Sequence, residues 1–158
     1  MGEAKARRRA HAQLLAKHTR CIYCAGANTA TTVEHMPPIM MFDRRQRPKG
    51  LEFPTCEGCN HGTRLTDLVA SLLGRVYPDA ETDPEKKELK KFLTAVSNNV
   101  PGLLEEMLAD EADQYRAWQE IPNMPAGSTV LRANGPILAD HMRTFGAKLI
   151  PARSLSFL

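Results

Sequence analysis

Two Cys-x-x-Cys pairs, with no other cysteine in the chain, are the feature that most constrains how these 158 residues can fold. The first pair is Cys21 and Cys24, and the second is Cys56 and Cys59. Four thiolates in this pattern are the ligand set of a tetrahedral structural zinc site. A thioredoxin-like redox pair requires a strand-to-helix context in a parallel sheet, which the sequence does not indicate. The prediction is therefore structural Zn²⁺, with a redox pair or free buried cysteines as alternatives.

The segment between the two pairs is longer than a zinc unit alone requires. It has 31 residues, whereas common zinc ribbons have a spacer of roughly 15–20 residues. Its central feature is Glu34-His35, at the end of a predicted strand and shortly before two prolines. A neutral His35 could accept a proton from water, because the pKa of an unperturbed histidine is about 6.5. Glu34 offers hard oxygen ligands suited to Mg²⁺ or another divalent ion. The plainer interpretation of His35 is a packed or hydrogen-bonded histidine.

Asn60 and His61 follow the last cysteine, at the predicted start of a helix. A helix N-terminus carries partial positive charge and free amide groups, so it favours a phosphate or a metal–phosphate pair. We therefore expect Asn60 or His61 to help Glu34 hold a divalent ion. The alternatives for His61 are an ordinary helix-start residue and a spare zinc ligand.

Basic residues are concentrated in the half of the chain that contains the cysteines. Residues 1–75 carry 12 Lys/Arg and 6 Asp/Glu, a formal charge of +6, whereas residues 76–158 carry −3. Cations in the first half would meet phosphates and release counterions, which is the general source of nucleic-acid affinity. A solvated charged surface is the alternative. The side chains expected to follow a phosphate backbone are Arg7, Arg8, Arg9, Arg44, Arg45 and Arg64.

The spacing of apolar residues predicts an α+β fold that is predominantly helical. Strands are expected over residues 29–34 and 51–53. Helices are expected over residues 3–19, 58–76, 83–98 and 101–118, and from Gly135 onward. The expected domains are residues 1–76, a basic helix followed by the zinc unit, and residues 77–158, a helical extension.

The sequence excludes two classes of targeting segment. No apolar run reaches the roughly 18 residues that a membrane-spanning helix needs. The N-terminus is basic but lacks the apolar stretch and cleavage site of a secretory signal. We therefore expect a cytoplasmic protein without a membrane partner, and paired cysteines in that compartment favour a metal over disulfides.

The order Cys-x-x-Cys, Glu-His-x-x-Pro, Cys-x-x-Cys-Asn resembles the HNH endonuclease family in its zinc-stapled ββα-metal form. The resemblance covers about residues 21–73, a third of the chain. In that family an acidic residue and a histidine end the first strand; the acid binds the catalytic divalent ion and the histidine activates the attacking water. These positions match Glu34 and His35. Asn60, or its neighbour His61, matches the residue at the helix start that helps to hold the metal or the phosphate.

One position departs from the family's pattern. Members usually carry an asparagine in the loop a few residues before the third cysteine, where this chain has Leu51. Asp43 and Glu52 are candidates to replace it. Many members carry a basic residue within a turn of the helix start, and Arg64 fits that position.

The resemblance implies a metal-dependent HNH-type endonuclease that hydrolyses phosphodiester bonds in nucleic acid, DNA rather than RNA. The general base would be His35, the catalytic ion would be Mg²⁺ or another divalent ion, and Zn²⁺ would be structural. One alternative, which the absent loop asparagine favours, is an inactive zinc-stapled module that binds nucleic acid. Another is a helical interaction protein with a purely structural zinc. A protein partner or a second copy could bind through residues 77–158.

Overall fold

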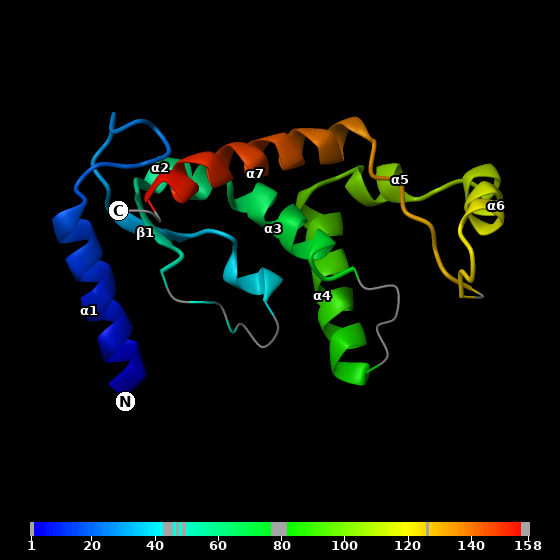
Figure 1. The fold of residues 1–158 in the computed structure, drawn as a ribbon, viewed down its shortest axis with the longest axis horizontal. Coiled ribbons are helices and arrows are strands. Elements are labelled where there is room, and N and C mark those ends of the chain that lie inside the picture. Colours follow the sequence, from blue (N-terminus) through cyan, green and yellow to red (C-terminus); the bar gives the residue numbers. More distant parts are fainter. Residues whose placement is uncertain are drawn as a thin grey trace. The chain divides into compact units, whose positions relative to one another are not determined.

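The computed structural model describes the backbone of residues 2–42, 46, 48, 50–76, 82–125 and 127–155. Within them the chain is predominantly helical with a two-stranded antiparallel sheet (Figure 1), which confirms the expected α+β class. The strands are β1 (Thr32–His35) and β2 (Glu52–Thr55). The helices are α1 (Gly2–Lys17), the 3-10 helix η1 (Ile39–Met41), α2 (Glu57–Gly62), α3 (Arg64–Leu73), α4 (Asp83–Asn99), α5 (Leu103–Met107), α6 (Glu111–Glu120) and α7 (Pro136–Leu155). None of the described helices combines the length and the apolar character needed to cross a bilayer.

Two compact units make up the chain. The first contains the residues up to Asp67 together with those from Thr144 onward, and the second is Leu68–Arg143. Helices α3 and α7 each contribute residues to both units. The division expected from sequence kept 77–158 together, whereas the end of α7 lies with the first unit, where Lys148 pairs with Asp67.

The sheet of the first unit gives each of its residues a defined side. Strands β1 and β2 pair antiparallel, with Thr32 opposite Thr55 and His35 opposite Glu52. The two segments predicted as strands are therefore confirmed as strands, and they pair with each other. Because side chains alternate along a strand, Thr32 and Glu34 lie on one face, and His35 and Glu52 lie on the other.

The helix predicted over residues 58–76 is divided in two. Helix α2 ends at Gly62 and α3 begins at Arg64, with Thr63 between them. The Thr63 hydroxyl donates a hydrogen bond to the carbonyl of Cys59 at 3.1 Å. Such local bonds compete with the helical backbone pattern, and glycine lowers helix propensity, so the break falls where both effects meet.

Helix α4 begins at Asp83, where the sequence predicts a helix to start. Thr82, not Asp83, is the N-cap of α4, and its N–H donates to Glu85 Oε2 at 3.2 Å. The helix expected over 101–118 is two helices, α5 and α6. Asp110 starts α6 by accepting a hydrogen bond from Asp113 N–H at 2.9 Å. The apolar residues buried in this unit include Val69, Leu72, Phe92, Val96, Val100, Leu103, Met107 and Leu138.

Helix α7 begins against a carboxylate from α5. The Glu106 side chain accepts hydrogen bonds from Ile137 N–H and Leu138 N–H, each at 2.8 Å. A carboxylate is favourable there because the first amides of a helix have no partner within the helix. A Cβ on Gly135 would overlap the Glu106 side chain, so glycine permits this close approach.

We expect Gly135→Ala to destabilise the protein by about 1–3 kcal/mol, because the added methyl group displaces Glu106 from the two amides. Gly146→Ala is the matched control, since a Cβ at Gly146, within the same helix, meets no atom within 4 Å. It should be neutral or stabilising by up to about 1 kcal/mol. Urea unfolding measures both. Equal stability of the two variants would contradict the capping role of Glu106.

Candidate functional site

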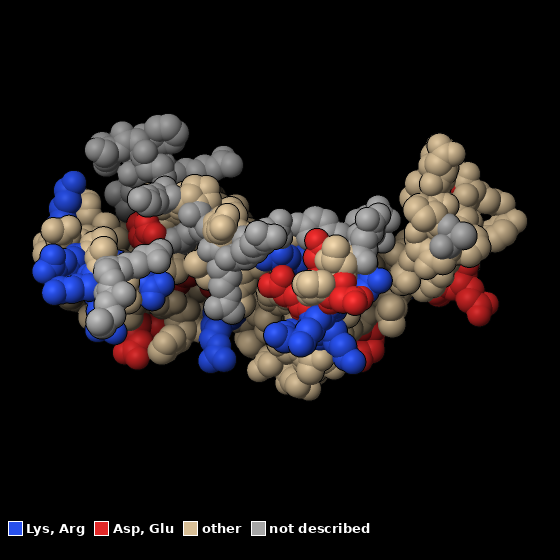
Figure 2. All heavy atoms as spheres, turned by 90° about the horizontal axis from the view of Figure 1, so that it is seen from below, with Lys and Arg blue, Asp and Glu red and all other residues tan. Residues whose placement is uncertain are grey.

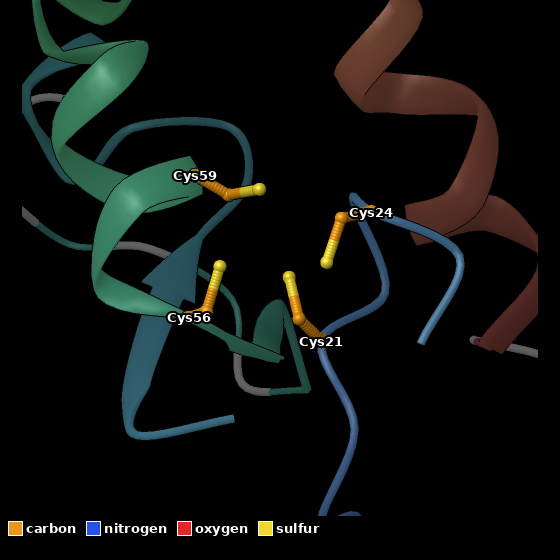
Figure 3. Close-up of side chains that lie close together, drawn as sticks. All are labelled: Cys21, Cys24, Cys56 and Cys59. Atoms are coloured by element: carbon orange, nitrogen blue, oxygen red, sulfur yellow. The ribbon is translucent and has the colours of Figure 1, made fainter. Parts of the chain in front are cut away.

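The four cysteines converge on one point. Their Sγ atoms all lie within 4.8 Å of one another, and Figure 3 shows Cys21 and Cys24 approaching from one chain segment and Cys56 and Cys59 from another. All four are free cysteines. Cys21 and Cys56 are buried, and the other two are half-buried. This group could hold one metal ion, so the expected convergence of the two pairs is confirmed.

A tight turn after α1 positions the first pair. Gly26 adopts a φ of +81°, a left-handed conformation that costs glycine little. Its N–H donates to the carbonyl of Cys21 at 2.9 Å, and the N–H of Cys21 donates to the carbonyl of Asn28 at 3.0 Å. The Asn28 side-chain amide donates to Cys24 Sγ at 3.6 Å. The turn thus supplies the sulfurs of Cys21 and Cys24 and a hydrogen bond to that of Cys24.

Strand β2 delivers the second pair. Cys56 follows the strand directly as the N-cap of α2, and Cys59 lies in the first turn of that helix. The N–H of Ile22 donates to the carbonyl of Pro54 at 3.2 Å, which joins the first turn to β2. Backbone hydrogen bonds therefore hold the two cysteine segments together.

The surroundings of the sulfurs favour a bound cation. Burial acts to raise the pKa of Cys21, but hydrogen bonds with the Thr55 side chain and with the backbone of Cys56 and Cys24 outweigh it and lower the pKa to about 6. Burial, with the neighbouring Cys56 and Cys21 sulfurs, raises the pKa of Cys59 to about 12. Four thiolates this close together would need a positive charge between them, and this donor set fits a tetrahedral metal ion.

Glu34 lies in a buried ionic cluster. Its Oε1 is 3.6 Å from Lys148 Nζ, which also contacts both carboxylate oxygens of Asp67 at 2.7 and 2.8 Å. Glu34 is 6% exposed and Lys148 is 5% exposed. Burial raises the pKa of both carboxyl groups, although Lys148 opposes the rise. Sequence reasoning missed Asp67 and Lys148, because each lies on an ordinary helix pattern and 81 positions separate them.

His35 has different neighbours from Glu34. Its ring centroid is 5.7 Å from that of His11 in α1, and it lies opposite Glu52 in the sheet. Nε2 of His11 is buried and has no hydrogen-bond partner among the described residues. Sequence reasoning also missed His11, whose only signal was its place on the basic helix. Adjacent residues at the end of β1 thus meet two separate groups of ionisable side chains.

Asn60 and His61 do not start the helix, because α2 begins at Glu57. The N–H of Asn60 donates to the carbonyl of Cys56, and its side-chain amide donates to Thr32 Oγ1 at 2.9 Å. Asn60 therefore fastens α2 to β1 on the Glu34 face of the sheet. His61 is exposed, with Nδ1 3.9 Å from the Glu57 carboxylate.

Glu34, Asn60 and His61, the expected ligands of a catalytic divalent ion, stay a prediction. Among the described residues, the only His, Cys, Asp or Glu side chains placed in a group of three or more that could share an ion are the four cysteines. Leu51, at the position of the family's loop asparagine, accepts a hydrogen bond from Met36 N–H through its carbonyl at 3.1 Å. Asp43, which with Glu52 is a candidate to replace that asparagine, lies outside the described residues.

The arginines expected to meet phosphates are partly described. Arg7, Arg8 and Arg9 are exposed on α1, and Arg64 is exposed at the start of α3. Figure 2 shows Lys and Arg side chains gathered over α1, at the left of the view. Arg44 and Arg45 lie outside the described residues.

Comparison of the chain with protein-family models, with curated proteins and with solved structures found no match.

We expect the purified protein to contain one metal ion per chain, measured by elemental analysis. Cys59→Ser should abolish stoichiometric binding and lower the thermal midpoint, because it removes one of four ligands. Asn28→Ala keeps all four sulfurs but removes a hydrogen bond to one, so metal affinity should fall by roughly 10–100-fold. Metal-free wild-type protein that remains folded, or a Cys59→Ser variant that retains its ion, would contradict the metal centre.

Proposed function

We propose that this chain is a zinc-stapled ββα protein that hydrolyses phosphodiester bonds in nucleic acid, with DNA as the preferred substrate, in the manner of the HNH endonucleases that its sequence resembles. The observation that supports the proposal is the arrangement of β1, β2 and α2 beside the cysteine cluster. Strand β1 ends at His35, and β2 leads directly into Cys56. Asn60 of α2 is hydrogen-bonded to Thr32 of β1.

His35 is the residue to which we assign proton transfer. It would accept a proton from the water whose oxygen attacks phosphorus, as the bond from phosphorus to the leaving oxygen breaks. Exposed Arg7, Arg8 and Arg9 support binding of the phosphate backbone on the α1 side, where His11 lies near His35. The resemblance implies Mg²⁺ or another divalent ion as cofactor and Glu34 as a ligand, but Lys148 already pairs with the Glu34 carboxylate.

A specific observation favours a second function, that of a zinc-stapled module that binds nucleic acid without cleaving it. The carboxylate expected to bind the catalytic ion lies 3.6 Å from the ammonium group of Lys148, and Leu51 stands where the family has an asparagine. Both functions require affinity for polyanions, and only the first requires His35 to act as a base.

We expect the wild-type protein to nick or cut plasmid DNA in the presence of Mg²⁺, Mn²⁺ or Ni²⁺. His35→Ala should lower the cleavage rate by a factor of about 10²–10⁴, the usual contribution of a general base. His141→Ala, in α7, is the matched control and should cleave at the wild-type rate. Gel analysis of supercoiled plasmid measures all three proteins.

Intact plasmid with the wild-type protein under all three metals would reject the hydrolase, and a gel shift on the same samples would then identify the binding module. A His35→Ala variant as active as wild type would reject the assignment of the base.

We expect nucleic-acid binding to weaken with salt, because the basic side chains release counterions. Replacing Arg7, Arg8 and Arg9 together with Ala should reduce the slope of log affinity against log salt by up to about 3, since each phosphate contact contributes roughly 0.9. Replacing Lys86, Lys87 and Lys90, which are exposed on α4, removes the same charge and should leave the slope unchanged. Gel shifts between 50 and 200 mM salt test this expectation over a range in which about 10³–10⁵-fold changes are common. Equal effects of the two triple variants would show that net charge, and not the α1 arginines, sets the affinity.

A further inference from the structure

Side chains from three distant parts of the chain meet within the first unit, two of them buried (Glu34 and Lys148) and one half-buried (Asp67). Glu34 comes from β1, Asp67 from α3 and Lys148 from α7. The Lys148 ammonium group contacts both Asp67 oxygens at 2.7 and 2.8 Å but lies 3.6 Å from Glu34 Oε1. It also lies 5.8 Å from the centre of the Tyr23 ring. The lysine is thus held in place on several sides.

One oxygen of this cluster is left without a donor. Glu34 Oε2 is buried and has no hydrogen-bond partner among the described residues. The Glu34 side chain as a whole is only 7% exposed. A buried carboxylate oxygen without a donor is unfavourable, because it loses its hydration and gains no bond in return. Lys148 does not donate to this oxygen, because its short contacts both go to Asp67.

The charges of the cluster are also unequal. In the contacts described above, two carboxylates meet one ammonium group, and one positive charge balances one ionised carboxylate. A divalent cation carries the missing charge, and carboxylate oxygens are the ligands that Mg²⁺ and Mn²⁺ prefer.

We propose that Glu34 and Asp67 form a latent divalent-cation site, and that the ammonium group of Lys148 occupies this site as a built-in cation. The folded chain then excludes a metal ion from Glu34 until the Lys148 segment of α7 moves away. Asp67 and Lys148 become determinants of metal binding that the family resemblance does not include. The inference bears on the proposed function because Glu34 is the metal ligand there, but metal binding is measured without any cleavage.

Lys148→Met tests the proposal, because methionine keeps much of the side-chain volume and removes the charge. Mn²⁺ is titrated by calorimetry and by electron paramagnetic resonance, and the thermal midpoint is followed with and without Mn²⁺. Four proteins are compared: wild type, Lys148→Met, Lys148→Met combined with Asp67→Asn, and Lys17→Met. Lys17 is exposed on α1, so its replacement controls for the loss of a positive charge elsewhere in the first unit.

We expect Lys148→Met to bind Mn²⁺ at least tenfold more tightly than wild type or Lys17→Met. Its thermal midpoint should rise with Mn²⁺, because a ligand that binds only the folded state stabilises that state. The added Asp67→Asn change should remove both effects. A folded Lys148→Met variant that binds Mn²⁺ no better than wild type would overturn the proposal, as would wild-type binding that depends on Asp67.

If the uncompensated carboxylates of Glu34 and Asp67 unfold Lys148→Met, Mn²⁺ should restore the circular dichroism spectrum of the folded protein. Lys148→Gln serves as a second neutral variant. Failure of both variants to fold with Mn²⁺ would show that the cluster accepts only an ammonium group, which contradicts a latent site. If the wild-type protein does not cleave plasmid, the proposed hydrolase is rejected, and the Mn²⁺-binding result stands unchanged.

Discussion

The convergence of four cysteine sulfurs is the constraint on which the first unit depends. It joins the turn after α1 to the start of α2, two segments separated by 31 residues of sequence. Backbone hydrogen bonds link the same parts of the chain. The N–H of Ile22 donates to the carbonyl of Pro54, and the N–H of Thr31 donates to the carbonyl of Thr55. Strand β1 is therefore held between the two cysteine segments, and the residues at its end, Glu34 and His35, have fixed surroundings.

Strand alternation divides the chemistry of the first unit between two faces. On one face Glu34 meets Lys148 and Asp67, in a buried cluster closed by the end of α7. On the other face His35 meets His11, beside the exposed arginines of α1. The proposed base and the proposed cation site therefore lie on opposite faces of the sheet, where they cannot act on the same phosphate without a rearrangement. This separation links the proposed hydrolase to the proposed release of Lys148, because a divalent ion at Glu34 requires a change on that face first.

The sequence predicted the features that depend on local spacing. The cysteine pairs, the two strands and the start of α4 near Pro84 follow from short motifs, and the structure has each of them within a few residues. The helix breaks at Thr63 and Asp110 were missed, because side-chain bonds to the backbone outweighed a continuous apolar pattern. The pairing of Asp67 with Lys148 was also missed. No periodicity relates residues 81 positions apart, so only the packed fold reveals that pair.

X-ray absorption spectroscopy of the purified protein at the zinc edge tests the central claim most directly. Four sulfur ligands at about 2.3 Å, with no nitrogen or oxygen in the first coordination sphere, are expected if both cysteine pairs bind one Zn²⁺. A spectrum with histidine or carboxylate ligands in place of sulfur, or with two sulfurs per zinc, would contradict the account. In that case the two chain segments would not be joined through one ion.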